Sequence, residues 1–119
     1  MNAARPWPVE LRLAKDKTTF TVSFDTGETF ALAAEYLRVE SPSAEVQGHG
    51  GDQKLIIGGK RHVTITDVEP VGNYAVRLRF DDGHDTGLYS WDYLHELGST
   101  HAEKWATYLA ALRSRRLDR

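Results

Sequence analysis

Alternating apolar and polar residues mark the first strands of the chain. The alternation runs over residues 9–13 and 20–24, and a third segment, residues 28–32, follows an Asp-Thr-Gly turn in which Gly27 can take a positive φ. A period of two predicts strands with one buried face. The residues expected on that face are Val9, Leu11, Leu13, Phe20, Val22 and Phe24. These segments predict an antiparallel meander.

The strand pattern returns in the second half of the chain, over residues 54–60 and 62–80. One face of the last strand is expected to carry Tyr74, Val76, Leu78 and Phe80. Between the two halves, residues 33–39 predict a short helix, which Ser41-Pro42 should end. The glycine-rich residues 41–52 predict the longest loop.

Helical signals close the chain. Ser90 is expected to cap a helix that ends at Gly98, and Thr100 with Glu103 predicts a capping box for a second helix. An apolar stripe on this second helix is expected to cover the sheet: Trp105, Tyr108, Leu109 and Leu112. The whole pattern predicts the α+β class, with an antiparallel β-sheet meander packed against C-terminal helices, and a single domain over residues 1–119.

Composition removes several classes of chemistry. The chain has no cysteine, so disulfides, thiolate zinc sites and cysteine nucleophiles are excluded. A net charge of −2 argues against a broad nucleic-acid interface. No apolar run reaches the roughly 18–20 residues of a membrane span, and the N-terminus lacks the apolar core of a signal peptide. We therefore expect a cytoplasmic protein that binds neither nucleic acid nor membrane.

The densest chemistry lies in residues 80–95, FDDGHDTGLYSWDYLH, with four acidic residues and two histidines. His84 and Asp85 are neighbours on the chain and should point to opposite faces, so they do not form a facial iron triad. A composite site of His84 and His49 with Asp82 or Asp85 could hold a divalent ion such as iron or zinc. The simpler interpretation is that His84 is a turn residue and that His84→Ala has a mild effect.

No catalytic residue stands out. Ser90 is explained as a helix cap, no serine lies in a G-x-S-x-G motif, and the glycine-rich segments do not match a phosphate loop. The aromatic residues Tyr89, Trp91, Tyr93 and Trp105 are expected in the core. Trp7 lies between two prolines near the N-terminus, where a surface role or a partner contact is expected.

Two long motifs resemble one family. EYLRVESPSAEVQGHG (residues 35–50) and VEPVGNYAVRLRFDDGHDTGLYSWDYLHELG (residues 68–98), together with Trp105, are similar to the small bacterial domain called DUF971. This domain is also described as the gamma-butyrobetaine hydroxylase-like N-terminal domain. The resemblance extends from Val9 to Leu112.

The resemblance implies a zinc module without its ligands. In gamma-butyrobetaine and trimethyllysine hydroxylases this domain precedes the catalytic iron barrel, and it binds zinc through three cysteines and one histidine. The cysteine positions correspond to Ser41, Ser43 and Val46 in this chain, and His84 corresponds to the histidine. Serine and valine do not replace a thiolate on zinc, so we expect the structural zinc and any other cofactor to be absent.

The resemblance also bears on function. Only seven residues follow Leu112, so no hydroxylase barrel is expected after it. The same domain type occurs joined to P-loop ATPases of iron–sulfur cluster assembly. The favoured hypothesis is a non-catalytic interaction module for a protein partner, accessory to iron–sulfur or oxygenase proteins, acting as a monomer or homodimer. The alternative is a metal-binding protein that uses His84 and His49 with nearby carboxylates.

Overall fold

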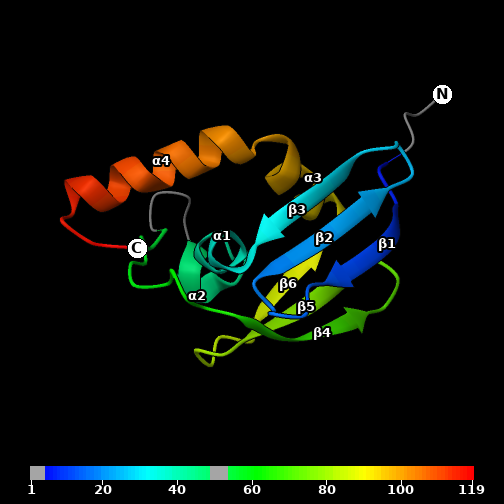
Figure 1. The fold of residues 1–119 in the computed structure, drawn as a ribbon, viewed down its shortest axis with the longest axis horizontal. Coiled ribbons are helices and arrows are strands. Elements are labelled where there is room, and N and C mark those ends of the chain that lie inside the picture. Colours follow the sequence, from blue (N-terminus) through cyan, green and yellow to red (C-terminus); the bar gives the residue numbers. More distant parts are fainter. Residues whose placement is uncertain (1–4, 49–53) are drawn as a thin grey trace.

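The computed structural model describes residues 5–48 and 54–119, which form two antiparallel sheets and four helices (Figure 1). The first sheet has the order β1-β2-β3 and the second the order β4-β5-β6. The strands are β1 Pro8–Leu13, β2 Thr19–Phe24, β3 Thr29–Ala33, β4 Ile65–Val71, β5 Ala75–Phe80 and β6 Gly87–Ser90. The helices are α1 Ala34–Val39, α2 Ala44–Gln47, α3 Trp91–Ser99 and α4 His101–Ser114. The α+β class is confirmed. None of the helices in these residues has the length and hydropathy to cross a membrane.

The first sheet buries its central strand. Phe20, Val22 and Phe24 of β2 all face the core, as their alternation predicts. The prediction is wrong for β1, where Val9 is 66% and Leu11 37% exposed. β1 is an edge strand of its sheet, so Leu11 lies at the margin of the core, and Val9 lies in an irregular register between Pro8 and Glu10.

The second sheet repeats this arrangement around β5. Val76, Leu78 and Phe80 are buried, but Tyr74 lies in the turn before β5 and is 55% exposed, so its predicted place on the buried face is wrong. Residues 54–60 form no strand. That segment instead runs beneath α4, where Tyr108 donates its hydroxyl hydrogen to the carbonyl of Ile57 at 2.5 Å. Burial raises the pKa of Tyr108 to about 12.

The short helix α1 lies inside the molecule, between the sheets and α4 (Figure 1). The stripe on α4 covers this helix rather than the sheet: Tyr108 and Leu112 pack with Val39 at the end of α1. Trp105 lies between this cluster and the main core and is partly buried. The expectation that the stripe covers the sheet is therefore wrong, because α1 occupies that position.

The sequence predicts the cap of α3 correctly, but not the end of α3 or the cap of α4. Ser90 caps α3 by accepting the backbone N–H of Tyr93 at 3.1 Å, as expected. Gly98 does not end the helix, since α3 continues to Ser99. Thr100 forms no capping box, because its hydroxyl donates to the carbonyl of Glu96 at 2.7 Å. α3 and α4 therefore follow one another with almost no linker.

Gly98 permits the close approach of α3 to β3. A Cβ atom at this position would lie 2.3 Å from Cγ of Phe30. We expect Gly98→Ala to destabilise the fold by about 1–3 kcal/mol, although alanine favours helix by about 1 kcal/mol. Urea unfolding measures the change. The double variant Phe30→Leu with Gly98→Ala should recover most of the loss, and a Gly98→Ala protein as stable as wild type would contradict this packing.

Candidate functional site

His84 follows the turn between β5 and β6, and it is buried. Gly83 takes φ +91°, and the His84 N–H donates to Oδ1 of Asp82 at 3.0 Å. The residue is only 5% exposed, so the interpretation of His84 as a plain turn residue is wrong. The turn directs the imidazole inward, against the segment that follows α1.

Both ring nitrogens of His84 have partners. Nδ1 lies 3.1 Å from Oε1 of Glu45, and Nε2 lies 2.8 Å from Oγ of Ser41. An ionised carboxylate only accepts, so Nδ1 carries the proton and Nε2 accepts the hydroxyl hydrogen of Ser41. Burial lowers the pKa of His84, and the nearby Arg38 lowers it further, against the opposing effect of Glu45. Burial and Arg38 therefore favour the neutral imidazole over the protonated one.

The two serines extend this network. Ser41 is fully buried, and its Oγ accepts the N–H of Ser43 at 3.2 Å. Ser43 Oγ caps α2 by accepting the N–H of Glu45 at 3.1 Å and lies 2.6 Å from the hydroxyl of Thr86. Gly87 allows Ser41 to approach β6 closely, because a Cβ atom at position 87 would lie 2.7 Å from Ser41 Oγ.

A charged group borders the network. Asp82 Oδ2 lies 2.7 Å from Nε of Arg38 and 2.6 Å from Nζ of Lys60. Burial acts to raise the pKa of Asp82, but hydrogen bonds from Lys60, the His84 N–H and Arg38 lower it to about 2. Asp85 faces elsewhere and lies 3.8 Å from Arg79. His84 and Asp85 therefore diverge, as their adjacency predicts.

Two tyrosines of the same stretch satisfy the end of α1. Tyr89 is fully buried and donates to the carbonyl of Leu37 at 2.5 Å, and Tyr93 donates to the carbonyl of Glu40 at 2.5 Å. The last carbonyls of a helix have no partner within the helix, so a buried helix end needs such donors. Burial raises the pKa of both tyrosines. Tyr89 is in the core as predicted, and both tyrosines have a structural role.

The order Ser41–His84–Glu45 matches the order of a nucleophile, a base and an acid in hydrolases. Ser41 is fully buried, however, and its Oγ is committed to His84 and to the Ser43 N–H. A substrate has no path to this hydroxyl. The role that this arrangement supports is structural: its hydrogen bonds hold the residues after α1 against the β5–β6 turn.

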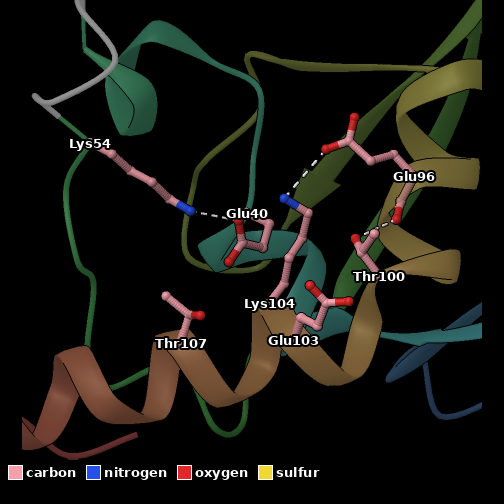
Figure 2. A pocket seen from close by; sticks show the side chains of 7 residues that line it. All are labelled: Glu40, Lys54, Glu96, Thr100, Glu103, Lys104 and Thr107. Carbon is pink, nitrogen blue, oxygen red and sulfur yellow. Dashed lines mark hydrogen bonds and ion pairs between the residues drawn. The ribbon is translucent and has the colours of Figure 1, made fainter.

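Among the surface hollows of the described residues, two differ in chemical character. One of about 410 Å³, between α1, α3 and α4, is polar: Lys54 contacts Glu40 at 2.5 Å, and Lys104 contacts Glu96 at 3.3 Å (Figure 2). Its paired charges largely neutralise each other. The other hollow, of about 290 Å³, is aromatic and is described next.

The aromatic hollow is lined by Trp7, Tyr74 and Trp91. Trp7 meets Trp91 edge to face with ring centroids 6.3 Å apart, and Trp91 Nε1 donates to the carbonyl of Asn73 at 2.9 Å. Trp7 is 48% and Tyr74 55% exposed. The expected surface position of Trp7 is confirmed. Trp91 is partly buried and also packs against the main core.

The family model described as Gamma-butyrobetaine hydroxylase-like, N-terminal matches residues 11–95. This chain belongs to that family. A crystal structure of a protein with unknown function from Acidithiobacillus ferrooxidans ATCC 23270, which belongs to the DUF971 family, is 41% identical with a TM-score of 0.64. The match covers 76% of this chain and 91% of that one. The resemblance inferred from the two motifs is confirmed.

Two solution NMR structures are also similar to this DUF971 chain. Both are 46% identical to it, with TM-scores of 0.84 and 0.83. The first match covers 98% of this chain and 91% of the other, and the second covers 100% and 89%. No curated protein is detectably similar to the chain. The comparisons therefore establish the family and the fold.

The family resemblance implies zinc, and the residues present do not fit it. The structure brings Ser41, Ser43 and His84 together, as the correspondence with the three cysteines and the histidine requires, and Val46 is buried nearby on α2. Serine hydroxyls and a valine offer no thiolate, and the Nε2 atom that would face a metal is bonded to Ser41. Among the described residues, no group of three or more histidine and acidic side chains could hold a metal ion.

His49 lies outside the described residues, so the proposed pairing of His84 with His49 stays a prediction. Sequence reasoning missed Glu45 as the partner of His84, and Arg38 as the partner of Asp82. The members of each pair lie 39 and 44 residues apart, and no local pattern connects them. It also missed that Tyr74 and Trp91 join Trp7 in one hollow.

We expect His84→Ala to destabilise the fold by about 2–4 kcal/mol, because it leaves a cavity and removes the acceptor of the buried Ser41 hydroxyl. This replaces the mild effect expected from the sequence. Chemical denaturation measures the change. The exposed His62 provides the control, since His62→Ala should change stability by less than about 0.5 kcal/mol. Equal stability of the two variants would contradict a structural role for His84.

The same contact predicts a pH dependence. The folded pKa of His84 lies below its ordinary value of 6.5, so the unfolded chain binds the proton more readily. The contribution of His84 is complete above pH 6.5 and is lost as the pH falls through the folded pKa, with a slope of at most about 1.4 kcal/mol per pH unit. Denaturation at several pH values should show this loss in wild type and in His62→Gln, and not in His84→Gln. An unchanged slope in His84→Gln would contradict the assignment.

Proposed function

We propose that the chain is a non-catalytic protein-interaction module, accessory to proteins with iron–sulfur or oxygenase metal centres. The observation that carries the proposal is the contrast between its two candidate sites. His84, Ser41 and Ser43 are buried and hydrogen-bonded to one another or to neighbouring polar groups, whereas Trp7 and Tyr74 of the hollow are exposed. Catalysis at His84 would require a substrate to reach a buried group. Binding at the aromatic hollow requires only that a partner contacts exposed side chains.

The aromatic hollow has the composition of a binding surface. Tryptophan and tyrosine are enriched where proteins bind partners, because each combines a large apolar area with a polar tip. Trp7 and Tyr74 project from the start of β1 and from the β4–β5 turn, and the base of Trp91 is fixed by α3. A partner could bury these rings with little rearrangement of the backbone. This supports a protein partner rather than a nucleic acid or a membrane.

The link to metal-centre proteins rests on the family. The family model is named for the N-terminal region of a hydroxylase, and this likeness supports a partner of the oxygenase class. The extension to iron–sulfur proteins and to the cytoplasm is part of the proposal. Metal binding by His84 and His49 is less well supported, because both ring nitrogens of His84 are engaged.

Affinity capture with matched surface variants tests the proposal. Tyr74 and Leu55 are both 55% exposed, and Leu55 does not line the aromatic hollow. We expect wild type and Leu55→Ser to capture the same proteins, Tyr74→Ser to lose them, and all three to unfold at similar denaturant concentrations. The captured proteins, purified and assayed for iron, should contain an iron–sulfur or oxygenase component.

Two results would count against the proposal. Capture that Tyr74→Ser does not weaken would exclude the aromatic hollow as the binding surface. If the partners that depend on Tyr74 contain no metal centre, the chain is still an interaction module, but its proposed accessory role is contradicted.

A further inference from the structure

The edge strand β1 has an unpaired side. In the part of the chain that the structure describes, β1 pairs with β2 alone and lies at the margin of its sheet (Figure 1). The backbone N–H of Ala14 donates to the carbonyl of Thr19 in β2. On the other side of β2, the N–H of Phe24 donates to the carbonyl of Glu28, the residue just before β3. Hydrogen-bonding direction alternates along antiparallel strands. The N–H and C=O groups of Leu11 and Leu13 therefore point away from β2.

The side chains of this edge are also uncovered. Leu11 and Leu13 lie opposite Val22 and Phe20, so they are on the core side of the sheet. Leu11 is nevertheless 37% exposed, and Val9, which lies in the irregular register between Pro8 and Glu10, is 66% exposed. A strand added next to β1 would extend the sheet and cover Leu11.

The other outer strands have features that oppose strand addition. β4 contains Pro70, an irregular register between Ile65 and Asp67, and charged residues on its outer side. β3 and β6 are both contacted by α3. Proline, bulges, charges and covering helices are the devices by which proteins protect sheet edges. β1 has Pro8 and an irregularity at its start, but residues 10–13 are regular.

We propose that β1 pairs with β1 of a second copy of this chain, antiparallel and centred on Leu11. The sequence Val-Glu-Leu-Arg-Leu of residues 9–13 is complementary to itself in this register. Leu11 meets Leu11 of the second copy, and Val9 meets Leu13. Glu10 lies opposite Arg12 of the second copy, and Arg12 opposite its Glu10. The outward-facing N–H and C=O groups of Leu11 bond those of Leu11 in the second copy, and those of Leu13 lie opposite Val9, at the irregular start of the strand.

The charges are free to make these contacts. Within one chain, Arg12 pairs with Glu10 at 3.0 Å, but the two side chains are 67% and 52% exposed. Such an exposed pair contributes little to stability, so exchanging it for a pair between two copies costs little. Two charge pairs and a short apolar contact give a small interface, and the dimer is of the weak, reversible class. The inference does not rest on the proposed function.

Charge reversal tests the register. Sedimentation velocity over protein concentrations from micromolar to millimolar should show a monomer–dimer equilibrium for wild type. Glu10→Arg and Arg12→Glu each place like charges opposite one another, so each alone should raise the dissociation constant about tenfold or more. The double variant Glu10→Arg with Arg12→Glu should restore the dimer, and an equimolar mixture of the two single variants should form a heterodimer.

Amide chemical shifts locate the contact. Those of Leu11 and Leu13 should change with protein concentration in wild type and not in either single variant, while Leu55, far from β1 in the sequence, should not change. A wild type that stays monomeric up to millimolar concentration would overturn the proposal. Dimerisation that the single variants retain would overturn the register and the use of β1. Neither result bears on capture through Tyr74.

Discussion

The fold depends on hydrogen bonds to the backbone polar groups of a short helix, α1, that lies inside it. α1 is almost completely buried, and six residues provide few hydrogen bonds of their own. Its last carbonyls are reached by the hydroxyls of Tyr89 and Tyr93, and the hydroxyl of Tyr36 reaches the carbonyl of Leu97 in α3. The stretch from Phe80 to His95 completes α1 through Tyr89, Tyr93 and the contact of Asp82 with Arg38.

Hydrogen bonds also hold the segment that follows α1. Where the family resemblance implies three thiolates and a histidine around zinc, this chain has Ser41, Ser43, Val46 and His84, and hydrogen bonds connect three of them. A buried histidine, hydrogen-bonded to a serine and a glutamate, connects the α1–α2 segment to the β5–β6 turn. These groups hold the fold, whereas Trp7, Tyr74 and the outer edge of β1 are exposed.

Local signals in the sequence predict those parts of the fold where one rule decides the outcome. The alternation in β2 and β5 and the Ser90 cap are such cases, while the position of His84 beside Ser41 is implied only by the family resemblance. The prediction fails where position in the whole molecule decides. β1 alternates but lies at an edge, residues 54–60 are held by α4, and Gly98 accommodates Phe30 instead of ending α3. Glu45 and Arg38 could not be assigned to the site, because contacts across 39 and 44 residues depend on the packing of both sheets around α1.

The central claim is that hydrogen bonds, rather than a metal ion, link His84 to the residues after α1. Elemental analysis of the purified protein, combined with thermal unfolding before and after exhaustive chelation and again with added zinc or iron, tests it most directly. We expect no stoichiometric transition metal and one unchanged melting temperature in all three conditions. One tightly bound ion per chain, lost on chelation together with several degrees of thermal stability and removed by His84→Ala, would contradict the account.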